Sequence, residues 1–235
     1  VCSPDKVKVI PLGFDLSRFR EDQESKRKRF RNEYSIHEDE LAIGIIGRLV
    51  PVKNHPMFIE AVKRISSLRV PQKLRFFIVG DGEERDHLLE VAKSSGIDTA
   101  YFPEEARAAT LTFTSWRRDV DVVMSGLDIV ALTSWNEGTP VSLIEAQAAG
   151  KPVITTDVGG IENAVSSGKT ALLVPTGDVD RLVSSLLQLI HENEMRQAMS
   201  LRGWEFVKDR FHYTRLVAEM AQLYRELLDS KKLKS

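Results

Sequence analysis

Short apolar runs alternate with amphipathic segments along most of the chain. The apolar runs show little internal alternation, as is typical of strands that are covered on both faces. They predict strands at Leu41–Ile46, Leu74–Val79, Thr110–Thr114, Ile129–Leu132, Val153–Thr155 and Leu172–Val174. Helical periodicity predicts helices over Pro56–Ser66, Glu83–Ser95, from Pro140 to about Gly150, over Val179–Glu194, and onward to about Arg210. The alternation indicates an α/β fold with a doubly wound parallel sheet.

The two ends of the chain depart from this pattern. Lys6–Ile10 reads as a short alternating strand, and Glu21–Asn32 as a charged helix that contains the basic run Lys26–Arg29. That run could bind phosphates, but acids flank it on both sides, which favours a solvated helix face. Tyr213–Leu228 is amphipathic, and its apolar stripe predicts docking, either within this molecule or on a partner domain. Residues 99–109 have no clear pattern and stay unassigned.

Composition narrows the class of protein. The 235 residues are 42% hydrophobic and 29% charged, which fits one large α/β domain with or without appendages. The formal net charge of −1 gives no general attraction to nucleic acid. The single cysteine, Cys2, can form neither an internal disulfide nor a metal cluster. There is no apolar run of membrane-spanning length and no signal-peptide pattern. Because the sequence begins at Val1, we expect a fragment or a processed product.

The stretch from Ala131 to Thr156 combines a strand end, a polar turn and the start of a helix. Pro140 suits the first helical position, and Thr139 before it could cap the free backbone N–H groups. A helix that starts here directs its positive end into the crevice above the strand ends, where open parallel sheets bind ligands. The stretch therefore predicts an anion site.

Two acids bracket this turn. Glu137 lies in the turn and Glu145 about one turn inside the helix, so both can face one cleft. A carboxylate offers two acceptor oxygens and matches neighbouring hydroxyls of a ribose or a hexose. The backbone N–H groups of Gly138, Thr139 and Val141 can receive phosphate or sugar oxygens. Isolated acids are usually solvated surface residues, but the intervening Gly-Thr-Pro favours a binding role here.

Two other strand ends carry candidate chemistry. Gly47 follows the first predicted strand of the sheet and allows a close ligand approach, while Arg48 and Lys53 can place two cations over one anion. Both cations could equally be ordinary surface residues. Gly80-Asp81-Gly82 suggests a dinucleotide fingerprint, but its third glycine is missing, so a tight strand-to-helix turn is favoured.

Taken together, these stretches resemble the C-terminal, donor-binding domain of a retaining GT-B glycosyltransferase of glycosyltransferase family 4. Four stretches carry the resemblance in the family's order: VIPLGFDLSRF at Val9–Phe19, IGIIGRLVPVKN at Ile43–Asn54, FIVGDGEERDHL at Phe77–Leu88, and Leu132–Gly160 with its E-x7-E element. GKTALLVPTGD at Gly168–Asp178 is similar to the family's usual ending. The resemblance covers nearly the whole chain.

The resemblance implies roles for matching residues. Arg48 and Lys53 would hold the donor pyrophosphate and stabilise the leaving group, Glu137 would contact the transferred sugar, and Glu145 would bind the ribose. Other donor-binding residues would be Gly47, Gly138, Thr139, Pro140 and Val141, with Trp116 and Arg117 near the nucleotide base. The sequence departs from the family's Gly-Gly-Ile-Pro-Glu at Gly159–Asn163, so no role is carried onto Glu162.

The resemblance also implies the setting of the enzyme. Residues 1–210 would form the Rossmann-like nucleotide-sugar-binding domain, and residues 211–235 a helix that packs back toward a missing N-terminal, acceptor-binding domain. The donor is expected to be a UDP-sugar, the acceptor a saccharide or a lipid-linked sugar in polysaccharide biosynthesis, and no metal or other cofactor is expected. The complete hexosyltransferase would be cytoplasmic, and peripheral at the inner face of the membrane through the missing domain. The fragment alone would be inactive.

Two other functions are compatible with the same motifs. A sugar-nucleotide epimerase on this fold would need an acid and a base of its own, for which the sequence offers no candidates. A noncatalytic nucleotide-binding module would need only the pocket.

Overall fold

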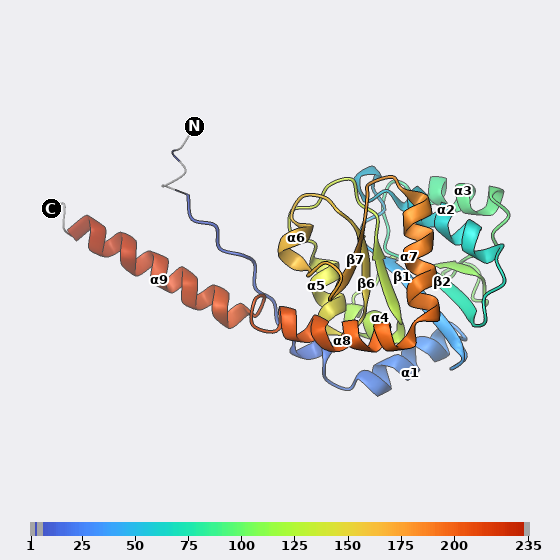
Figure 1. Ribbon diagram of the computed structural model, residues 1–235, viewed down its shortest axis with the longest axis horizontal. Helices are drawn as coiled ribbons and strands as arrows, with labels where there is room; N and C mark the ends of the chain where they lie inside the picture. Colours follow the sequence, from blue (N-terminus) through green and yellow to red (C-terminus); the bar gives the residue numbers. More distant parts are fainter. Residues whose placement is uncertain (1–2, 4–6, 233–235) are drawn as a thin grey trace.

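A computed structural model describes Ser3 and residues 7–232 of the chain. Within these residues, seven parallel strands form one sheet in the order β3-β4-β2-β1-β5-β6-β7 (Figure 1). The strands are β1 (Glu40–Ile46), β2 (Lys73–Val79), β3 (Thr99–Tyr101), β4 (Leu111–Phe113), β5 (Ile129–Leu132), β6 (Val153–Thr156) and β7 (Ala171–Val174). The predicted doubly wound α/β fold and its central strands are confirmed. The strand β3 lies at the start of the segment that the sequence left unassigned.

Helices cover both faces of the sheet, which explains why its strands lack alternation. The helices are α1 (Gln23–Glu33), α2 (His55–Ser66), α3 (Arg85–Ser94), α4 (Val120–Gly126), α5 (Val141–Ala148), α6 (Ile161–Ala164), α7 (Val179–His191), α8 (Asn193–Val207) and α9 (Tyr213–Lys232). One core packs beneath α1, α4, α5 and α6, and the other beneath α2, α3 and α7. The short helices α4 and α6 were absent from the predicted pattern, because a helix of four to seven residues has too few turns for a clear period.

The connections place a switch point between β1 and β5. From β1 the chain builds one half of the sheet through β2, β3 and β4, and it then returns beside β1 to build the other half through β5, β6 and β7. The loops after β1 and β5 therefore leave in opposite directions and open a crevice at the carboxyl ends of these strands. This crevice is where the candidate site lies.

The expected first strand is wrong for the residues that the structure describes. Residues 7–10 have no strand partner and run beside α9 (Figure 1), where the Lys8 Nζ atom lies 3.1 Å from a carboxylate oxygen of Glu226. Val9 is 84% exposed, so its alternating pattern does not reflect burial. Lys6 and Cys2 lie outside the described residues.

The basic run of α1 is only partly the solvated face that the sequence suggested. Lys28 and Arg29 are exposed, but Lys26 pairs with Asp121 at 2.9 Å and Arg27 pairs with Asp128 at 2.8 Å. The difference arises because α1 packs against α4, whose acids and flanking residues meet this side of the helix. Lys26 and Arg27 of the basic run therefore form ion pairs with neighbouring elements of the same chain.

The helix α9 projects away from the sheet (Figure 1). Its first residue and the residues just before it join the N-terminal segment through backbone bonds, in which Tyr213 N donates to Phe14 O and Phe14 N donates to Phe211 O. Tyr224 and Leu227 of the predicted apolar stripe are 61% and 53% exposed. The described core thus leaves this part of the stripe uncovered, and the division of the chain at residue 210 remains a prediction.

Two glycines allow the loops after β1 and β2 to touch. A Cβ atom on Gly80 would lie 1.9 Å from the Gly47 carbonyl oxygen, and one on Gly82 would lie 2.4 Å from the Leu49 carbonyl oxygen. Gly80 also has a φ of +146°, which side chains disfavour. Close backbone packing thus explains both glycines, in agreement with the tight-turn interpretation. The same packing supports the loop that carries Arg48.

We expect Gly80→Ala to lower the free energy of unfolding by about 2–4 kcal/mol, because backbone strain adds to a backbone clash. Gly168→Ala is the matched control: Gly168 also has a positive φ, of +70°, but a Cβ there would meet nothing within 4 Å. Its cost is strain alone, about 1–2 kcal/mol. Urea denaturation measures both, and equal losses would contradict the role given to the Gly80–Gly47 contact.

Candidate functional site

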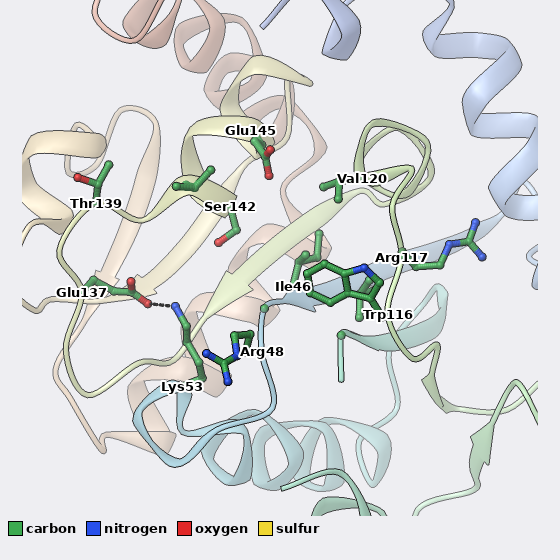
Figure 2. Close-up of a pocket in the computed structure, with 14 residues that line it drawn as sticks. Ile46, Arg48, Lys53, Trp116, Arg117, Val120, Glu137, Thr139, Ser142 and Glu145 are labelled. Atoms are coloured by element: carbon green, nitrogen blue, oxygen red, sulfur yellow. Dashed lines mark hydrogen bonds and ion pairs between the residues drawn. The ribbon is translucent and has the colours of Figure 1, made fainter. Parts of the chain in front are cut away.

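A cavity of about 340 Å³ opens at the switch point between β1 and β5 (Figure 2). It brings together most of the predicted site residues, namely Gly47, Arg48, Lys53, Trp116, Arg117, Glu137, Thr139, Val141 and Glu145. The remaining two, Gly138 and Pro140, line a neighbouring cavity that shares Thr139 with the first. Elements on both sides of the switch point therefore contribute to a single pocket.

Glu137 sits at the centre of a hydrogen-bonded group. Its Oε1 atom accepts from Lys53 Nζ at 2.6 Å and from Ser134 Oγ at 2.6 Å, and its side chain is only 7% exposed. Ser134 is itself buried, and its carbonyl oxygen accepts from Thr156 Oγ1 at 2.7 Å. Sequence reasoning missed Ser134, although it lies only three residues before Glu137. The carboxylate thus enters the pocket in a fixed orientation.

The loop that carries Lys53 is anchored to the end of β5. Thr133 Oγ1 donates to the Asn54 carbonyl oxygen at 2.9 Å, and Trp135 N donates to the Val52 carbonyl oxygen at 2.8 Å. Lys53 itself ends the short 3-10 helix η3 (Pro51–Lys53), and Asn54 follows in the left-handed region with a φ of 49°. These bonds place the Lys53 side chain opposite Glu137.

The Glu137 loop is held from its other side by the glycine pair after β6. Cβ atoms on Gly159 and Gly160 would lie 2.1 Å and 1.7 Å from the carbonyl oxygens of Glu137 and Gly138. Gly160 N also donates to the Glu137 carbonyl oxygen at 2.8 Å. The glycines are therefore required for packing against the acidic turn, a role that their place in the sequence alone did not indicate.

Arg48 is a free cation at this site. It is exposed, and among the described residues its guanidinium has no ion-pair or hydrogen-bond partner. Lys53, by contrast, is occupied by Glu137. An anion that enters the cavity meets Arg48 directly and competes with Glu137 for Lys53.

The helix α5 begins one residue later than predicted. Pro140 is its N-cap and no side chain caps it, so the proposed Thr139 cap is wrong. Thr139 is exposed and lines the cavity instead. The first N–H groups of a helix have no partner within the helix, and Val141 and Ser142 both line the cavity. The start of α5 is therefore open to acceptor groups of a ligand; Ser142 was missed from the sequence.

Glu145 faces the same cavity from one turn further along α5 (Figure 2). Burial raises its pKa to about 7, nearby Arg18 opposes this rise, and Asp121 adds to it. The Arg18 Nη2 atom lies 3.9 Å from Glu145 Oε1. Near neutral pH this carboxyl group is divided between its protonated and ionised forms.

Trp116 and Arg117 follow β4 but behave differently. Trp116 is 63% exposed and its indole lies beside Ile46 at the cavity (Figure 2). The Arg117 guanidinium points away from the other labelled residues, donates to both Glu33 and Asp119, and has its pKa raised chiefly by the bond to Glu33. Only its remaining atoms border the cavity, so Arg117 anchors the loop that presents Trp116.

The described residues show no group of three or more His, Cys, Asp or Glu side chains that could hold a metal ion. None of the helices described is both long and apolar enough to cross a membrane.

The acids of the cavity act singly: Glu137 is bound to Lys53, and Glu145 lies nearest to Arg18. The chemistry of this site is therefore that of cations, open backbone N–H groups and isolated carboxyl groups.

The fold is that of a Rossmann-like half of GT-B glycosyltransferases. Anabaena Alr3699/HepE, solved in complex with UDP, matches it with a TM-score of 0.82 and 22% identity, over 95% of this chain and 58% of that one. The model of the family "Glycosyl transferases group 1" matches residues 26–205, and the chain belongs to this family.

Curated relatives agree with this membership. D-inositol 3-phosphate glycosyltransferase of Saccharomonospora viridis is 29% identical over 237 residues, which cover 96% of this chain and 51% of that protein. The Escherichia coli enzyme UDP-Gal:alpha-D-GlcNAc-diphosphoundecaprenol alpha-1,3-galactosyltransferase is 26% identical, over 97% of this chain and 56% of its own length. The chain thus spans about half the length of the curated relatives it matches.

The raised pKa of Glu145 predicts a dependence of stability on pH. Because the folded pKa of about 7 lies above the ordinary glutamate pKa of 4.5, the folded state keeps a proton that the unfolded state loses, so stability falls as pH rises between these values. Glu145→Gln removes this loss. We expect it to gain about 3 kcal/mol relative to the natural protein between about pH 4 and about pH 8.

Urea denaturation across this pH range measures the gain. The exposed Glu162 of α6 provides the control, since Glu162→Gln should show no comparable trend. A Glu145→Gln curve parallel to that of the natural protein would refute the buried, partly protonated state of Glu145.

Proposed function

We propose that this chain is the C-terminal, donor-binding domain of a retaining GT-B glycosyltransferase of family 4. The donor is a UDP-sugar, and a hexosyl group passes to a saccharide or lipid-linked acceptor. The observation that carries this proposal is the single cavity at the switch point. It joins two cations, the open start of α5 and two carboxyl groups.

The polar groups divide the cavity into subsites. Arg48, Lys53 and the first N–H groups of α5 match a diphosphate, because all of them present positive charge or donors. Glu137 would accept hydroxyls of the transferred sugar, and Glu145 would accept those of the ribose. Trp116 offers an exposed ring on which a base could stack. In this arrangement the sugar lies toward Glu137 and the base toward the loop after β4.

The reaction follows from this placement. As the bond between the anomeric carbon and the diphosphate oxygen breaks, Arg48 and Lys53 neutralise the negative charge that develops on the leaving UDP. The acceptor hydroxyl forms its bond to the same face of the anomeric carbon, and its proton passes to an oxygen of the leaving phosphate. Retention of configuration results, and these steps call on no metal from the protein.

Relatives support the choice of donor. The name of the Escherichia coli relative specifies UDP-Gal, and Alr3699/HepE has been solved with UDP, with UDP and glucose, and with UDP-glucose. Since the chain spans about half the length of its curated relatives, we assign acceptor binding to a second domain. That domain would cover the exposed stripe of α9 and provide peripheral attachment at the cytoplasmic face of a membrane. An epimerase or a noncatalytic nucleotide-binding module is the alternative.

Isothermal titration with UDP and GDP tests the donor site in this chain. We expect UDP to bind, and Lys53→Ala and Arg48→Ala each to weaken binding about tenfold, since a charge-assisted bond contributes roughly 1.5 kcal/mol. Lys63→Ala, which removes a half-exposed cation of α2 that lies near Glu60, is the control and should bind UDP normally. Failure to bind either nucleotide at millimolar concentration would refute the proposal.

Glu137→Gln separates the sugar subsite from the diphosphate subsite. The change removes a negative charge and releases Lys53, so UDP should bind at least as tightly as before, whereas the contact of Glu137 with the sugar weakens. We therefore expect the affinity for UDP-glucose to improve less than that for UDP. Titration of both ligands measures this difference, with Glu162→Gln as the control. A variant that loses UDP affinity would contradict the assignment of Glu137 to the sugar.

A further inference from the structure

The stretch Val9–Phe19 contains a side chain that reaches the nucleotide pocket from outside it. The short 3-10 helix η2 (Ser17–Phe19) places the Arg18 Nη2 atom 3.9 Å from Glu145 Oε1. Arg18 does not line the cavity, and its side chain is 47% exposed, whereas that of Glu145 is 18% exposed. A half-exposed cation thus lies behind a largely buried acid of the pocket.

Several contacts hold Arg18 in this place. Asp15 Oδ1 accepts from Ser17 N at 3.1 Å and from Ser17 Oγ at 2.6 Å, which fixes the start of η2. Phe19 is buried, and the Arg18 guanidinium carbon lies 4.9 Å from its ring centre. Lys26 of α1 donates to the Arg18 carbonyl oxygen. These contacts fix the backbone of Arg18 and place its guanidinium against the Phe19 ring.

The other charges around Glu145 make this cation necessary. Asp121 of α4 is also negatively charged, so it disfavours the ionised form of Glu145. Lys26 partly offsets the charge of Asp121 through an ion pair of 2.9 Å. Within the described residues, Arg18 is the one positive group that acts on Glu145 directly. Lys53, Arg48 and Glu137 lie elsewhere along the same cavity. Without Arg18, burial and Asp121 would both favour the protonated acid.

We propose that Arg18 is a positioning residue that favours the charged form of the Glu145 carboxyl group, in which both oxygens accept the hydroxyls of the ribose. The proposal rests on the donor site proposed above. Arg18 acts through Glu145 and touches no part of the nucleotide. Its removal should therefore matter only at pH values where Glu145 would otherwise be protonated.

Titration of the chain with UDP over a range of pH tests this role. Loss of an opposite charge at this distance raises a carboxyl pKa by about one unit or more, so Arg18→Ala should bind UDP about fivefold more weakly than the natural protein near pH 7. Near about pH 9, where Glu145 is ionised in both proteins, the two affinities should converge. Arg18→Lys should restore most of the binding. Titration of the UDP phosphate affects every variant equally and cancels in these ratios.

Arg20→Ala is the matched control. Arg20 lies two residues away, is exposed, and stacks at 5.2 Å over the ring of Trp204, away from Glu145. We expect it to follow the natural protein at every pH. A structural defect in Arg18→Ala would lower binding at all pH values and would not recover at high pH.

The effect of Arg18→Ala on UDP affinity, measured in a protein that already carries Glu145→Gln, shows whether Arg18 acts through Glu145. If Arg18 acts through Glu145, Arg18→Ala has no further effect there. A loss in Arg18→Ala that is independent of pH, or that persists in this background, would overturn the proposal while leaving the donor site intact. Natural affinity for UDP in Glu145→Gln itself would instead overturn the ribose contact, and with it the role of Arg18.

Discussion

Lys53 and Glu137 lie 84 residues apart in the chain, yet their side chains meet at 2.6 Å, and this contact joins the two sides of the pocket. It exists because β1 and β5 are neighbours whose following loops cross over the same edge of the sheet. Bonds from Thr133 and Trp135 tie the Lys53 loop to the end of β5. Ser134 fixes the carboxylate. The ion pair thus links a loop from one half of the doubly wound sheet to a loop from the other half.

Several cations of the fold have partners within it, unlike the Arg48 side chain. Arg27 and Lys151 both reach the end of α4, where Lys151 Nζ donates to the Ser125 carbonyl oxygen at 3.0 Å. Asp128 accepts from Arg27 at 2.8 Å and lies 3.3 Å from Arg31. Cations at a helix C-terminus and beside a buried acid stabilise the fold. Arg48 differs from these cations in that its side chain is unpaired and lines the cavity, which makes it a candidate for a ligand contact.

The fold was predictable from the sequence because it depends on long apolar runs that are buried on both faces, such as Leu74–Val79 and Ile129–Leu132. The grouping of site residues was also predictable, since the E-x7-E spacing lies on a turn and the first helical turn after a strand. Side-chain partners were not. The sequence gives no sign that Arg117 turns toward Glu33, or that Arg18 reaches Glu145, because both contacts depend on tertiary packing.

Three features of the cavity depart from what local sequence rules predict. The start of α5 lacks the expected cap, Glu145 is buried at a cost to its ionised form, and Arg48 has no partner among the described residues. Uncapped helix starts also occur elsewhere among the described residues, but here the open helix start, the buried acid and the unpaired guanidinium face one cavity. A ligand that combines a diphosphate with sugar hydroxyls would satisfy all three, because it brings acceptors for Arg48 and for the helix start, and donors for Glu145. The unmet bonding capacity of the pocket therefore describes the chemistry of its ligand more fully than any one residue does.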